Sequence, residues 1–64
     1  MTSQDRARLT LAAHEAALAM HRDNGNAKAT RAAQARVNGL RTKLAGIVNR
    51  DAALAEKLAW VRAA

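Results

Sequence analysis

The two histidines are the side chains of this sequence best suited to catalysis or metal binding. His14 is followed by Glu15, as at the start of a zinc-protease helix, but Leu18 stands where that motif needs its second histidine. His14 and His21 are about 10.5 Å apart along a helix axis at ~1.5 Å per residue. Two nitrogens bound to one metal lie much closer together, so this pair cannot share an ion on one helix. We predict no metal site and expect structural or surface histidines, or pH-sensitive contacts across a symmetric interface.

The remaining residue types do not build an active site either. The five carboxylates are spread singly along the chain, which leaves no acid and base pair for one cleft. There is no cysteine, so neither a thiolate nor a disulfide is available. Ser3 falls in a terminus that we expect to fray. The sequence therefore predicts a protein that is not an enzyme and that needs no cofactor.

The clearest charge pattern is a middle segment of one sign. Between Asn24 and Arg50 the chain carries six basic residues and no Asp or Glu, whereas charges of both signs balance on either side. Such a segment tolerates self-repulsion, which favours an anionic partner. On a helix, five of the six cations fall mostly away from the apolar side, and we take these as the candidate nucleic-acid-binding residues: Lys28, Arg31, Arg36, Lys43 and Arg50.

Small residues separate these cations on the same side of the expected helix. Two of them are Gly39 and Gly46, and glycine inside a helix costs about 1 kcal/mol relative to alanine. Small residues beside cations would let a phosphate backbone, or another helix, approach the main chain closely. One tryptophan is the only aromatic residue, so there is no platform for stacking single-stranded bases. We expect electrostatic, weakly specific binding of DNA or RNA; a merely solvated face and an acidic protein surface are the alternatives.

The order of helix-forming and helix-stopping residues predicts an all-α, antiparallel helical hairpin in one domain over residues 1–64. Thr2 and Asp5 resemble a capping box at a helix start. Gly25 can adopt the left-handed conformation that stops a helix, and Asn26 can cap the next one. The expected elements are a helix over 4–22, a turn over 23–26 and a helix over 27–48.

The second helix carries a regular apolar row with spacings of three and four residues, which is suited to packing against another helix. The pattern does not decide whether this helix ends at residues 49–51, because Leu54, Leu58 and Val61 continue the rhythm. Asp51 would place a charge in the row, and Asn or Asp suits a helix cap, which favours a break. We therefore expect a short third helix over 51–62.

The first helix has two apolar rows on opposite sides, one with Leu9 and Met20 and the other with Leu11 and Leu18. Helices that are apolar on two sides are normally buried on two sides. We therefore expect a homo-oligomer, most simply a dimer, that packs as a helix bundle. The residues expected at the oligomer or partner interface are Leu11, Leu18, Val37, Leu40, Leu44, Ile47 and Trp60.

The alternative function is a protein-interaction module, such as a small phage or accessory-factor inhibitor, an adaptor or an assembly component. In this case the apolar faces of the first helix and Trp60 would bind the partner. The start of the chain lacks the apolar core of a signal peptide, and its longest apolar run is too short to cross a bilayer. We expect a cytoplasmic protein that does not act at a membrane.

Overall fold

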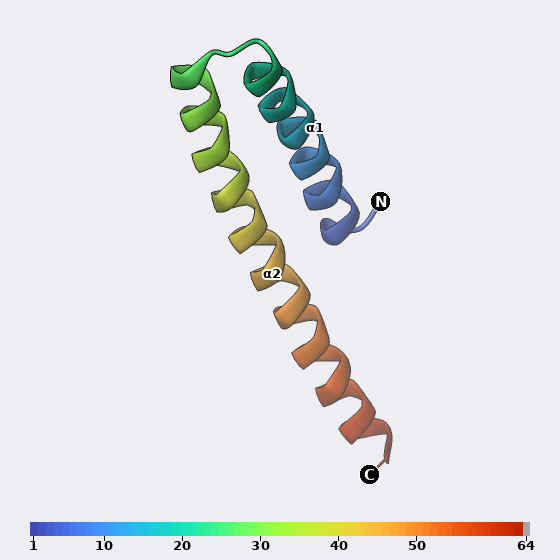
Figure 1. Cartoon of the computed structure of the whole chain (residues 1–64). Coiled ribbons are helices and arrows are strands. Elements are labelled where there is room, and N and C mark those ends of the chain that lie inside the picture. Colours follow the sequence, from blue (N-terminus) through green and yellow to red (C-terminus); the bar gives the residue numbers. More distant parts are fainter. Residues whose placement is uncertain (64) are drawn as a thin grey trace.

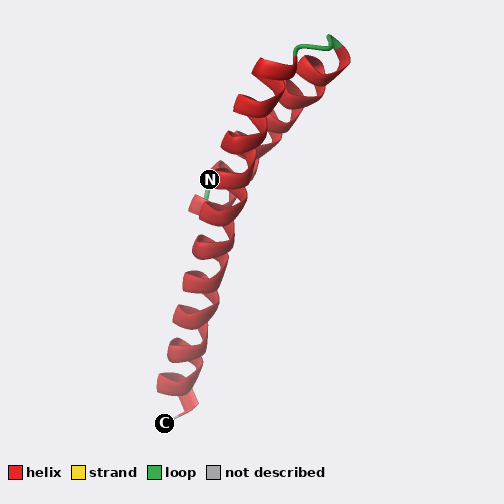
Figure 2. Ribbon diagram, turned by 60° about the vertical axis from the view of Figure 1, so that its left-hand side comes forward, coloured by secondary structure: helices red, strands yellow, loops and turns green. Residues whose placement is uncertain are grey.

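The computed structural model describes residues 1–63, which form two helices and no strand. Helix α1 (Ser3–Asp23) and helix α2 (Ala27–Ala63) run antiparallel and are joined by a short turn (Figure 1). Because α2 has 37 residues and α1 has 21, the end of α2 extends well beyond the start of α1. The chain is a rod of 58 × 19 × 11 Å with the turn at one end and α2 alone at the other (Figure 2). The all-α prediction is confirmed, and the oligomeric bundle stays a prediction.

Helix α1 begins with the capping box that the sequence indicates. The backbone N–H of Asp5 donates to Thr2 Oγ1 at 3.1 Å, and the backbone N–H of Thr2 donates to Asp5 Oδ2 at 3.1 Å. These bonds satisfy amides that the first turn of a helix leaves without partners. The hydrogen bond from the Thr2 backbone, followed by that from its side chain, lowers the pKa of the Asp5 carboxyl below its ordinary value.

The turn between the helices is a Schellman motif followed by an N-cap. Gly25 has a φ of 70°, in the left-handed region that favours glycine. Its N–H donates to the carbonyl of Arg22 at 3.1 Å, and the N–H of Asn26 donates to the carbonyl of His21 at 3.1 Å. Asn26 Oδ1 then accepts from the N–H of Ala29 at 3.1 Å, which caps α2. Both roles expected at this turn are therefore present.

The expected break at residues 49–51 is wrong, because α2 continues without interruption to Ala63. Residues 51–62 belong to α2 and do not form a separate third helix. The chain contains no proline, and no glycine follows Gly46, so no residue here disrupts the backbone ladder. Asp51 Oδ2 instead accepts a hydrogen bond from Gln4 Nε2 at 2.9 Å, so α1 satisfies the carboxylate.

The core is one line of contact between the two helices, which we call the seam. At its centre Val37 is fully buried and Leu18 is 7% exposed. Half-buried side chains extend it in both directions with spacings of three and four residues, as in coiled-coil packing. On α1 they include Gln4, Ala7, Leu11, His14 and His21, and on α2 Ala33, Leu40, Leu44, Ile47 and Asp51.

Candidate nucleic-acid interface

The continuous helix α2 places four cations at intervals of seven residues, and we call this set the cationic row: Arg36, Lys43, Arg50 and Lys57. Seven residues of α-helix advance about 10.5 Å and fall about 20° short of two full turns. The row therefore spans about 32 Å along α2 and turns by about 60° around it. Its members lie along one side of a single continuous helix.

The first two members of the row border the space between α1 and α2. Lys43 lines a groove of about 360 Å³ together with Arg6 and Thr10 of α1. Arg36 lines a smaller groove of about 160 Å³ together with both histidines of α1. No carboxylate lines either groove. This side of the hairpin is therefore positive on both helices.

The acidic side chain that faces α2 lies on the other side of the hairpin. Arg41 Nη2 donates to Glu15 Oε2 at 3.2 Å, and this pair is half exposed. Arg41 and Lys43 lie about 160° apart around α2, at about 100° per residue. The Glu15 carboxylate therefore compensates Arg41 and leaves the groove side positive.

The cationic row is largely unpaired. Among residues 1–63, Arg36, Lys43 and Lys57 form no ion pair. Arg50 Nε lies 4.0 Å from Asp51 Oδ1, and the two side chains are 70% and 42% exposed. An exposed pair at this distance contributes little stability and leaves the guanidinium accessible to another anion.

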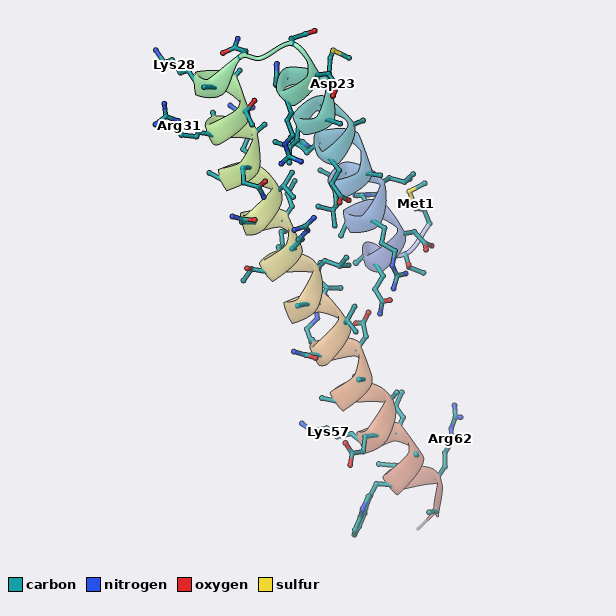
Figure 3. All side chains as sticks on the ribbon, viewed as in Figure 1. Met1, Asp23, Lys28, Arg31, Lys57 and Arg62 are labelled. Carbon is teal, nitrogen blue, oxygen red and sulfur yellow. The ribbon has the colours of Figure 1, made fainter. Side chains whose placement is uncertain are left out.

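The structure brings together three of the five predicted cations and separates the other two. Lys28 and Arg31 lie beside the turn and extend away from α1 (Figure 3). Around α2, Lys28 lies about 80° from Arg36 and Arg31 lies about 140° from it. The fourth member of the row is Lys57, which was not among the predicted residues. The seven-residue spacing that identifies Lys57 is visible in the sequence, but the expected break at 49–51 assigned it to another helix.

The two glycines of α2 lie next to the row. Gly39 and Gly46 are about 40° and 60° from Lys43 around the helix. A Cβ added at either position would have no atom within 4 Å, so packing within the hairpin does not require glycine there. The glycines leave the backbone of α2 open to solvent beside the cations.

The residues expected at an oligomer or partner interface divide into two groups. Six of them lie in the seam, where α1 and α2 of the same chain cover one another: Leu11, Leu18, Val37, Leu40, Leu44 and Ile47. Trp60 is 78% exposed. Of the two apolar rows on α1, the one with Leu9 and Met20 faces solvent, and these side chains are 58% and 62% exposed.

The histidines face α2 at the half-buried edge of the seam. His14 Nδ1 lies 2.8 Å from the carbonyl oxygen of Thr10, so this ring nitrogen is within hydrogen-bonding distance of the backbone of α1. In residues 1–63, no three His, Asp or Glu side chains are grouped as a metal ion would require. Neither helix of this range contains a stretch long and apolar enough to cross a bilayer.

No protein-family model, no curated protein and no solved structure matches the chain. Inferences about its function therefore depend on the geometry and charge of its own residues.

Proposed function

We propose that the protein binds nucleic acid through the cationic row of α2, by contacts to the phosphate backbone and with little preference for base sequence. The observation that supports this proposal is the alignment of four largely unpaired cations along one side of one continuous helix. A solvated face would need no such alignment. Arg6, which faces Lys43 across the groove, adds a fifth cation on the same side.

The dimensions of the row suit a long polyanion better than a small one. Its charges are about 10.5 Å apart, so one phosphate group could meet only one of them. Duplex DNA carries a charge for about every 1.7 Å of its axis, so each member of the row finds a phosphate without exact register. Contacts of this kind set position and affinity but do not read base sequence.

The salt dependence of binding tests the proposal directly. Affinity for a mixed-sequence duplex of about 25 base pairs would be measured by fluorescence anisotropy over a range of salt concentrations. At about −0.9 per neutralised phosphate, four contacts predict a slope of log affinity against log salt of about −3.6, and five predict about −4.5. Affinity that does not change with salt would rule the proposal out.

Two matched double variants separate the row from net charge alone. The first, Lys43→Gln with Arg50→Gln, removes two members of the row and should reduce the magnitude of the slope by about 1.8. The second, Arg8→Gln with Arg31→Gln, removes the same charge at positions about 160° from Arg6 around α1 and about 140° from Arg36 around α2, and should leave the slope nearly unchanged. Equal effects of the two pairs would mean that total charge, and not the row, binds the duplex.

A protein-interaction module is the second candidate function. It is favoured by the exposed apolar side chains near the end of α2, where Leu54, Leu58, Trp60 and Val61 are each at least half exposed. Leu11 and Leu18 are poor probes of this function because they hold α1 to α2. A homodimer remains a prediction under either function, and sedimentation velocity would measure its mass.

A further inference from the structure

The apolar row of α2 continues beyond the seam, past the start of α1. The bond between Gln4 Nε2 and Asp51 Oδ2 marks the last layer that α1 covers. Beyond it α2 extends through residues 52–63, about 18 Å of helix at ~1.5 Å per residue, which we call the free end. Here Leu54, Leu58 and Val61 keep the three- and four-residue spacing of the seam and are 57%, 50% and 72% exposed. The free end therefore presents a helix-packing face that this chain does not cover.

Positive charges border this apolar face on both sides. Lys57 and Arg62 point to opposite sides of α2 (Figure 3). Glu56 lies about 160° from Leu58 around the helix, so it belongs to the opposite surface. Asp51 is engaged by Gln4. Of the charged side chains in the free end, only cations can meet a helix that packs on Leu58.

A second copy of this chain would be a poor occupant of the face. In helix pairs with heptad spacing, residues beside the apolar line decide which partner and which orientation are accepted. An antiparallel copy centred on the free end would bring Lys57 towards its own equivalent, and a parallel copy would bring Lys57 towards Arg62. Both arrangements place like charges together, which disfavours them.

We propose that the free end of α2 is a docking site for an acidic amphipathic helix of another protein. The partner helix packs its apolar residues on Leu54, Leu58 and Val61, and its flanking carboxylates lie near Lys57 and Arg62. It occupies the position along α2 that α1 would occupy if α1 were longer by two or three turns. Recognition follows the helix-in-groove mode, with spaced apolar anchors for affinity and flanking charges for selectivity. The site shares only Lys57 with the cationic row.

A pair of synthetic peptides tests the charge requirement. The first has about three heptads, with leucine at the two apolar positions and glutamate at both flanking positions, and the second replaces each glutamate with lysine. Binding to the full chain would be measured by isothermal titration calorimetry at moderate salt. We expect one acidic peptide per chain, bound at least about tenfold more tightly than the lysine peptide. Equal affinity for the two peptides, or no binding of the acidic one, would overturn the proposal.

Variants of the protein locate the binding. Leu58→Asp lies outside the seam, so the hairpin should keep its circular dichroism spectrum while the acidic peptide no longer binds. The double variant Lys57→Glu with Arg62→Glu should reverse the preference between the peptides. Arg8→Glu with Arg31→Glu makes the same charge change elsewhere and should leave the preference intact. Reversal by both double variants would show a general charge effect and contradict the assigned site.

Two further measurements distinguish the other occupants. If sedimentation shows a dimer that Leu58→Asp dissociates, a second copy covers the free end and the proposal is wrong. The neutral variant Leu58→Gln removes the apolar anchor, adds no charge and keeps the whole cationic row, so its salt-dependent affinity for duplex DNA should match that of the unaltered protein. A loss of duplex affinity in Leu58→Gln would mean that nucleic acid occupies the face.

Discussion

Gly39 and Gly46 show how one missing side chain can bear on both stability and binding. Glycine lowers helix stability, and at these two exposed positions an added Cβ has nothing to clash with. We expect Gly39→Ala and Gly46→Ala each to stabilise the hairpin by about 0.5–1 kcal/mol, measured by urea denaturation followed by circular dichroism. If the glycines admit a phosphate backbone, the same variants should bind duplex DNA more weakly while folding more stably.

A matched change at Ala45, which is exposed on another side of α2, provides the control for the two glycines. Ala45→Gly should destabilise the helix by a similar amount and leave duplex affinity unchanged. Alanine variants that bind duplex DNA as tightly as the unaltered protein would show that no close approach occurs at positions 39 and 46.

At the scale of the elements, replacing the glycine of the turn should lower the stability of the protein, whereas replacing the glycines of α2 should raise it. Gly25 holds a φ of 70°, which alanine adopts only with strain. Gly25→Ala should therefore destabilise the protein by about 1 kcal/mol in the same denaturation experiment, whereas Gly39→Ala stabilises it. A neutral Gly25→Ala would mean that the Schellman motif contributes little to the hairpin.

Local sequence signals predicted the two helix starts and the turn because the bonds that form them join residues at most five apart. The break at 49–51 was wrong because the contact that satisfies Asp51 comes from Gln4, 47 residues away, where no local pattern records it. Because of the same error, Lys57 was assigned to a separate helix and was left out of the candidate site. Arg36, Lys43 and Arg50 lie on one side of α2 as expected, but Arg31 was wrongly grouped with them, because helical spacing alone already places it about 140° from Arg36.

At the scale of the whole molecule, the thin core makes the fold sensitive to what it binds. Val37 and Leu18 are the only buried hydrophobic side chains in residues 1–63. A ligand that binds only the folded hairpin should raise its stability, by about 2.7 kcal/mol at a concentration of 100 times Kd. We expect duplex DNA at low salt to raise the melting temperature, and Lys43→Gln with Arg50→Gln to lose most of that rise. Melting that is insensitive to duplex DNA in the unaltered protein would contradict binding to the folded state.

Because the two helices differ in length, the resistance of the backbone to local opening differs between the covered and the uncovered part of α2. The backbone around Val37 can open only if the hairpin itself opens, because α1 covers it. The last turns of α2 have no such cover, and a lone helical segment of this length is marginal in water, so they can fray while the rest stays intact. The chain thus joins a persistent hairpin to a short, more mobile tip, and binding of a neighbour there should first slow the motion of that tip.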